Sequence, residues 1–179
     1  DGTYTSKAGA STAISNDGLI AAMGAPFSDG ADVSLNNSGK IGIFKFDGSK
    51  WNQLGSDIHG SMDSGKFGTA IALNADGTRV AASEPYANDW DGQVRVFDFL
   101  NGEWIQIGST IQGSIGSLAV LGIDIAMSED GSILAIGSFE DKAYIYRFVG
   151  NDWELIDSDL IRCEQINLGA RKPIWRLQI

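Results

Sequence analysis

The chain has 179 residues, of which 43% are hydrophobic and 20% charged, and this length and composition fit one ordinary soluble domain rather than two. A formal charge of −10 argues against a nucleic-acid or anionic-membrane partner, because such binding draws on clustered Lys and Arg. With 23 glycines against 3 prolines, the chain favours many tight turns and an all-β fold. No apolar run is long enough to form a transmembrane segment.

An internal repeat of about 50 residues runs along the chain. Trp51, Trp104 and Trp153 are 53 and 49 residues apart, and each follows an aromatic residue by seven positions. Asp-Gly pairs keep step with the tryptophans at residues 17–18, 76–77 and 130–131. Two independent residue patterns therefore share one period, which predicts three copies of one structural unit.

Each unit is predicted to form four short antiparallel strands. In the first unit, residues 10–16 and 19–26 flank an Asp-Gly pair, which is the strongest short signal of a hairpin turn. A third strand follows at residues 40–46, where the pattern alternates, and a fourth begins near Trp51. The second unit repeats this order at residues 69–75, 78–85, 93–99 and 103–108, and the third at 123–129, 132–139, 142–148 and 152–157.

Four-stranded sheets at this interval are typical of β-propeller blades, which bury their faces by stacking on neighbouring blades. We therefore predict an all-β, β-propeller-like domain with blades at residues 1–61, 62–114 and 115–160 and a divergent basic tail at 161–179. The tryptophans and the aromatic residues before them, Phe44, Phe97 and Tyr146, are expected to fill the core between blades.

Three blades are fewer than the four to eight of a closed propeller, so the prediction is a partial or open ring. Exposed sheet faces and edges would promote aggregation. The end faces are therefore expected to be covered by more of a longer protein, by self-association or by a protein partner.

Two landmarks of the repeat resemble those of FG-GAP repeats, the blades of integrin α-subunit-like propellers. Phe67-Gly68 matches the first landmark and Gly24-Ala25-Pro26 matches the second, and each is intact in one unit only. The wider pattern of residues 1–160 is similar to FG-GAP repeats that contain tryptophan. The resemblance implies an adhesion-type protein-binding module that is extracellular or otherwise exported, while the residues themselves leave the compartment open.

Many FG-GAP blades also carry a calcium loop before the second landmark, and calcium takes six to eight oxygen ligands. Here the equivalent segments are reduced to Asp-Gly turns, so no calcium and no other cofactor is expected. Two acidic loops elsewhere are weaker metal candidates, although an ordinary solvated connection is favoured for both. Their oxygen-bearing side chains belong to Asp29, Asp32, Asn36, Asn37, Asn88, Asp89 and Asp91.

Two segments are candidate contacts for a partner. Trp90 lies within an acidic loop, where it would bind a partner or a glycan, or pack beneath its own blade. The tail breaks the repeat, beginning with Asp157 in place of the repeat's glycine. Its Trp175 stands beside basic residues, so the tail would add a strand or anchor an acidic partner. The basic residues are Arg171, Lys172 and Arg176.

No catalytic constellation is evident from the residues. His59 is the single histidine, and Gln112 occupies its position one unit later. Cys163 has no second cysteine with which to form an internal disulfide. The leading hypothesis is therefore a non-enzymatic interaction module. The alternatives are a structural subunit docked permanently in a larger complex, and a carbohydrate-binding or carbohydrate-active protein.

Overall fold

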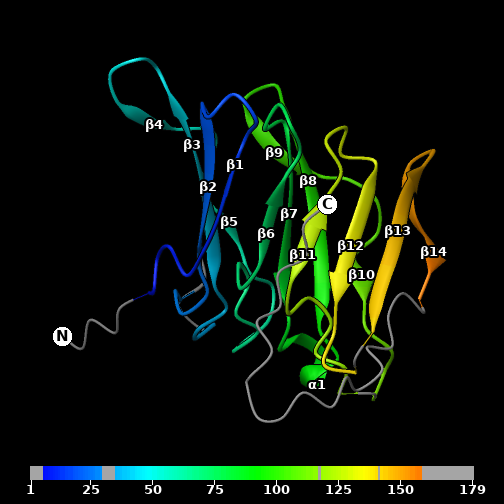
Figure 1. Cartoon of the computed structure of the whole chain (residues 1–179). Coiled ribbons are helices and arrows are strands. Elements are labelled where there is room, and N and C mark those ends of the chain that lie inside the picture. The colour runs from blue at the N-terminus through cyan, green and yellow to red at the C-terminus, as the bar shows by residue number, and fades with distance from the viewer. Residues whose placement is uncertain (1–5, 30–34, 117, 141, 159–179) are drawn as a thin grey trace, which may run out of the picture.

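The computed structural model describes residues 6–29, 35–116, 118–140 and 142–158. Within these ranges the fold is all-β apart from one helix of four residues, α1 (Ala87–Trp90). The strands form three antiparallel sheets, which stand side by side in chain order as an open stack (Figure 1). The predictions of an all-β fold and of three antiparallel sheets are confirmed. None of the helical structure in the described ranges is long and apolar enough to cross a bilayer.

The strand order is the same in all three sheets. Sheet 1 contains β1 (Ser11–Ile14), β2 (Ile20–Ala25), β3 (Lys40–Phe46) and β4 (Trp51–Gln53), with a short β5 (Ile58–His59) on β3. Sheet 2 contains β6 (Ile71–Leu73), β7 (Arg79–Glu84), β8 (Gln93–Leu100) and β9 (Glu103–Gln106), with a short β10 (Ile111–Gln112) on β8. Sheet 3 contains β11 (Ile125–Met127), β12 (Ile133–Gly137), β13 (Ala143–Val149) and β14 (Asp152–Asp157). The short fifth strands were not anticipated.

The Asp-Gly pairs form the turns of the first hairpin in every sheet. Asp17, Asp76 and Asp130 each accept a hydrogen bond from the backbone N–H two residues later, at 2.9 Å. A nearby Ser or Thr hydroxyl donates to each carboxylate as well. The hydroxyl first and the backbone second lower the pKa of all three side chains, that of Asp130 to about 2. These carboxylates therefore stabilise the turns in their charged form.

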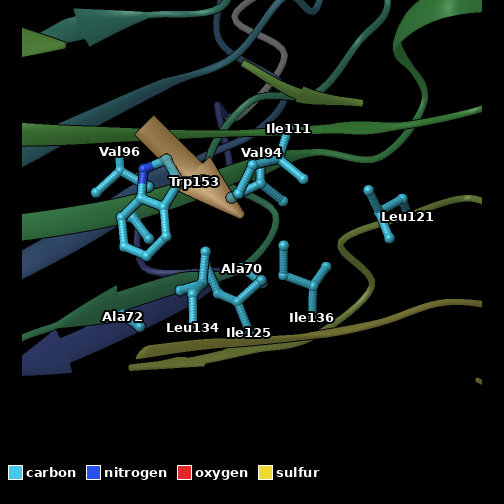
Figure 2. Packing of buried hydrophobic residues seen from close by; sticks show 11 residues of the cluster. Ala70, Ala72, Val94, Val96, Ile111, Leu121, Ile125, Leu134, Ile136 and Trp153 are labelled. Carbon is cyan, nitrogen blue, oxygen red and sulfur yellow. The ribbon is translucent and has the colours of Figure 1, made fainter. Parts of the chain in front are cut away.

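Two hydrophobic cores lie between successive sheets. The core between sheets 1 and 2 includes Ile41, Ile43 and Val80, all fully buried. The core between sheets 2 and 3 includes Leu134 and Ile136, which are equally buried and face the strands of sheet 2 (Figure 2). Alternation along each strand directs side chains to both faces, so the middle sheet contributes to both cores.

The three repeated tryptophans have unequal surroundings. Trp153 is 8% exposed and belongs to the second core, and Trp104 packs half-buried against the first, whereas Trp51 is 46% exposed. Expecting all three in cores is therefore wrong for Trp51, because no described sheet covers that face of sheet 1. Each indole packs on the aromatic residue five positions before it, with ring centroids 5.1–5.4 Å apart; these residues are Phe46, Phe99 and Phe148.

The two sequence landmarks meet where sheets touch. Phe67 is fully buried and forms an isolated parallel bridge with Gly39 of sheet 1. Next to it, a Cβ added to Gly24 would overlap the carbonyl oxygen of Gly68. Leu121 forms the equivalent bridge with Gly92. The glycines allow the backbones of neighbouring sheets to approach more closely than side chains would permit.

Candidate functional site

A surface cleft of about 560 Å³ lies between two loops at one end of sheet 2. One loop connects β5 to β6, and the other connects β7 to β8 and contains α1. The cleft is lined by both loops, through Met62, Asp63, Ser64 and Lys66 on one side and Tyr86, Asn88, Asp89 and Trp90 on the other. Polar and aromatic side chains therefore converge in one concavity, as they do in many ligand sites.

The α1 segment presents Trp90 to this cleft. Asn88, Asp89 and Trp90 have φ values of 53°, 55° and 76°, in the left-handed region that costs free energy for residues other than glycine. Trp90 remains 55% exposed, and its ring packs edge-on against Tyr86 with centroids 4.9 Å apart. Three consecutive strained residues thus hold an aromatic ring at the surface.

Lys66 contributes the positive charge of the cleft. Its Nζ lies 4.1 Å from the ring centroid of Tyr86 and 5.1 Å from that of Phe27. Such cation–π contacts hold the ammonium group in place. The carboxylates of Asp63 and Asp89 line the same cleft. The lining therefore has two formal negative charges and one positive charge at neutral pH.

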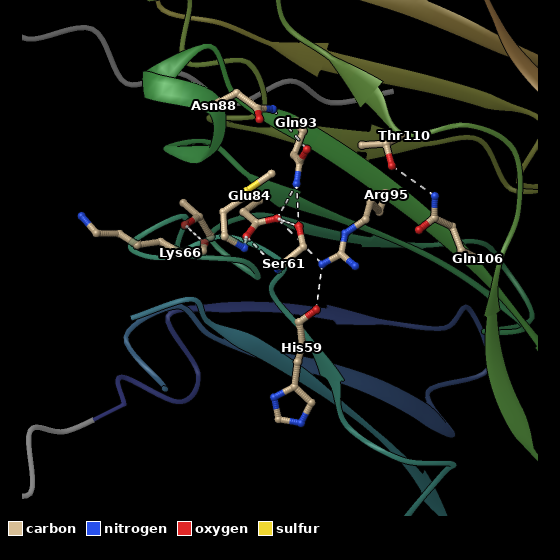
Figure 3. A network of polar contacts seen from close by, with 11 residues as sticks. His59, Ser61, Lys66, Glu84, Asn88, Gln93, Arg95, Gln106 and Thr110 are labelled. Atoms are coloured by element: carbon tan, nitrogen blue, oxygen red, sulfur yellow. Dashed lines mark hydrogen bonds and ion pairs between the residues drawn. The ribbon is translucent and has the colours of Figure 1, made fainter. Parts of the chain in front are cut away.

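The cleft rests on a buried polar network centred on Glu84 (Figure 3). Oε1 of this fully buried carboxylate accepts hydrogen bonds from the backbone N–H groups of Ser61 and Met62, both at 3.0 Å. Oε2 accepts from the Ser61 hydroxyl at 3.0 Å and from Gln93 Nε2 at 2.6 Å. A buried carboxylate is tolerated when its oxygens are satisfied in this way. Glu84 therefore fixes the start of the loop that carries Asp63 and Lys66.

Arg95 balances the charge of Glu84. Its Nη2 lies 3.8 Å from Glu84 Oε2 and donates to the backbone carbonyl of His59 at 2.7 Å. The guanidinium also stacks over the ring of Phe67, 4.2 Å from its centroid. Burial lowers the pKa of Arg95, and the negative charge of Glu84 opposes that shift. The pair spans from sheet 2 to sheet 1, so it links the cleft to the contact between sheets.

The loop residues proposed as metal ligands do not gather. Asp91 is buried, and its carboxylate accepts from the backbone N–H groups of Gly116 at 2.8 Å and Leu118 at 3.2 Å. Asn88 donates to the Gln93 side chain at 3.3 Å. Asp29 accepts from the Asn37 backbone at 3.1 Å. Within the described residues no three His, Cys, Asp or Glu side chains are grouped to hold a metal. Asp32 lies outside them, and cation binding stays a prediction.

Trp90 is the one proposed partner contact within the described residues, and it lines the cleft. The predicted tail contacts, Arg171, Lys172, Trp175 and Arg176, lie outside them. Sequence reasoning missed Lys66, Asp63 and Tyr86 as neighbours of Trp90. The four-residue spacing of Tyr86 and Trp90 was the available signal, whereas nothing local relates either residue to Lys66.

Comparisons with known proteins show a fold likeness. No protein-family model matches the chain, and no curated protein sequence does. The fold is similar to a crystal structure from Bacteroides uniformis of a protein described as a candidate 6-phosphogluconolactonase, with a TM-score of 0.58 and 16% sequence identity. The match covers 81% of this chain and 38% of that one. The chain thus spans well under half the length of the structure it resembles.

This likeness corrects the functional hypothesis. The sequence was interpreted as a non-enzymatic, adhesion-type module, whereas the solved structure with a similar fold is described as a candidate enzyme of sugar metabolism. Missing His and Cys constellations were a weak argument, because carboxylates such as Asp63 and Asp89 also carry out hydrolytic chemistry. The carbohydrate alternative is the better supported one. The resemblance to FG-GAP repeats stays a prediction.

Proposed function

We propose that the chain forms three blades of a β-propeller that acts on carbohydrates, and that the cleft beside Trp90 is its sugar site. The observation that carries this proposal is the exposed Trp90 ring, held on Tyr86 and bordered by Asp63 and Asp89. A sugar ring has an apolar C–H face that packs on an aromatic ring, and hydroxyl groups that donate to carboxylates.

The arrangement of the sheets supports the propeller part of this proposal. The first strands of the sheets, β1, β6 and β11, contact one another in sequence order, as the inner strands of neighbouring blades would. Three sheets match 38% of the similar structure, which leaves room in a chain of that length for about eight sheets, the upper end of the range in closed propellers. The landmark contacts between Phe67-Gly68 and Gly24 support shared ancestry with FG-GAP repeats.

The charge of the cleft favours an uncharged sugar or sugar lactone over a phosphorylated one. Asp63 and Asp89 outnumber Lys66, and the whole chain carries a formal charge of −10. A phosphate dianion would be repelled by this excess of negative charge. The proposed ligand class therefore differs from the phosphorylated substrate named in the description of the similar protein.

Lactone hydrolysis is the reaction class that fits this ligand. Water adds to the lactone carbonyl, the ring C–O bond breaks, and the released oxygen takes up a proton to leave a hydroxy acid. A carboxylate must accept a proton from the attacking water. Asp63 and Asp89 are the carboxylates of the cleft, and the Asn36 N–H orients Asp63 by donating to its Oδ1 at 2.9 Å.

Calorimetric titration with glucose and with glucose 6-phosphate tests the site. We expect glucose to bind at least tenfold more tightly than the phosphate ester. Trp90→Ala should weaken glucose binding by about tenfold, which is about 1.4 kcal/mol. Trp51→Ala is the matched control, since Trp51 is similarly exposed but lies on a different surface. Equal losses in both variants, or no binding to the intact chain, would overturn the sugar site.

Hydrolysis of glucono-δ-lactone tests the reaction separately. The protein should accelerate the spontaneous reaction, and Asp63→Asn or Asp89→Asn should remove most of the acceleration while glucose binding persists. Sugar binding with no acceleration would reject the hydrolytic step and leave the site intact. Tighter binding of the phosphate ester would reject the charge argument.

A further inference from the structure

An apolar groove of about 580 Å³ occupies the open face of sheet 1, away from sheet 2. We propose that another sheet of the same repeat covers this face, and that it receives Trp51 over a glycine placed just after its fourth strand. The open face of sheet 3 lacks that glycine, so a second copy of this chain is not the partner. This inference concerns assembly and is independent of the sugar site. The groove is lined by Thr12, Ala13, Ile14, Ala21, Ala22, Met23, Phe44 and Trp51.

The contact is visible between sheets 1 and 2. The indole Nε1 of Trp104 donates to the backbone carbonyl of Leu54 at 2.8 Å. Its ring lies over Gly55, which has φ +74°, and a Cβ added there would be 2.9 Å from Trp104 Cδ1. Sheet 1 thus offers a glycine after its fourth strand, and sheet 2 places a tryptophan on it.

The same contact recurs between sheets 2 and 3. Trp153 lies over Gly108, which has φ +65°, and a Cβ added to that glycine would be 2.7 Å from Trp153 Cδ1. In both cases the later sheet supplies the tryptophan and the earlier sheet supplies the glycine. The interface therefore has a direction along the chain.

Sheet 1 carries the tryptophan half of this contact with no glycine opposite it in the described part of the chain. Trp51 pairs with Phe46 in the register that joins Trp104 to Phe99 and Trp153 to Phe148. It is nevertheless 46% exposed. Gly9, which occupies the position of the buried Gly68 and Gly122, is also exposed. Sheet 1 thus presents the surface with which sheets 2 and 3 each dock on an earlier sheet.

Sheet 3 differs at both positions where a later sheet would dock. By strand register Asp157 stands where Gly55 and Gly108 stand in the other sheets. The same registers align residue 141, an aspartate, with Gly39 and Gly92, where a Cβ would overlap the backbone of the following sheet. Two carboxylates therefore replace two obligatory glycines, and sheet 3 does not accept Trp51 from a second copy.

The first experiment supplies the missing sheet. A second copy of residues 3–61 is placed directly before residue 3, so that the added Gly55 faces the original Trp51. In protein labelled with 5-fluorotryptophan, the Trp51 signal, assigned with Trp51→Phe, should lose its solvent isotope shift, and Tm should rise. The matched control carries Gly55→Asp in the added copy and should show neither change. A Trp51 that stays exposed, or equal protection in the control, overturns the proposal.

The second experiment does not depend on folding of an added sheet. The double variant Asp141→Gly/Asp157→Gly restores both glycines to sheet 3, so copies should associate head to tail at least tenfold more tightly than the unaltered chain in sedimentation equilibrium. Adding Trp51→Ala should reverse this gain. Association of the unaltered chain through Trp51, or no gain in the double variant, would overturn the proposal.

Discussion

The two contacts between sheets share a backbone arrangement and differ in their side chains. Phe67 bridges Gly39 in the first contact, and Leu121 bridges Gly92 in the second. The hairpins are also linked in series, because the Asn16 N–H donates to the Ala75 carbonyl and the Ala75 N–H donates to the Glu129 carbonyl, both at 2.8 Å. The stacking geometry is therefore a property of the repeat.

The side chains give the two contacts different character. The first includes the buried Glu84 and Arg95, which support the loop beside the cleft. The second has Ser138 at the register position of Glu84 and Tyr144 at that of Arg95, and its core is apolar. A repeat can thus place charge inside one contact for the sake of a neighbouring site and leave the next contact to hydrophobic packing.

Removing Glu84 should have the largest effect on stability. Glu84→Ala leaves Arg95 without its buried counter-charge and two backbone N–H groups without acceptors, so we expect a loss of about 3–5 kcal/mol in the free energy of unfolding. Ser138→Ala, at the equivalent position, should cost about 1 kcal/mol or less. Urea denaturation of both variants measures the difference. Equal losses would show that the two contacts do not differ as described.

Truncating the second core should have the next largest effect. Leu134 is fully buried between sheets 2 and 3, and Leu134→Ala should cost about 3 kcal/mol through lost burial and a cavity. Val80→Ala, at the same register position in the first core, removes fewer atoms and should cost about 2 kcal/mol. Denaturation midpoints in urea check this order. Loss of cleft binding in Leu134→Ala under native conditions would argue against the separation of the two contacts.

The smallest effect should come from the hairpin carboxylates. The pKa of Asp130 is about 2 in the folded state, below the ordinary 3.8, so its charged form stabilises the fold above about pH 3.8 and that stabilisation is lost as pH falls through 2. Asp130→Asn should lower Tm at pH 6, and the difference from the unaltered chain should shrink by pH 2. Glu129→Gln, which removes a neighbouring carboxylate outside this hydrogen-bond set, is the control. A constant difference across this range would contradict the assignment.

Local chemistry made much of the fold predictable. Asp-Gly turns and alternating strands involve residues a few positions apart, so the order of strands within each sheet follows from the sequence. The cleft was not predictable in this way, because Lys66 and Trp90 lie 24 residues apart on two loops whose meeting depends on Glu84. Reasoning from missing histidines also led to the wrong expectation about enzymatic activity.

The sequence by itself determined the three hairpin-based sheets and the glycines at which they touch, because turn chemistry and strand alternation act over short distances. Only the tertiary structure decided that Trp153 is buried while Trp51 is exposed, since burial depends on whether another sheet lies opposite. It also decided that Trp90 and Lys66 share one cleft. The physical reason is that identical repeats become different once stacking gives each a different neighbour.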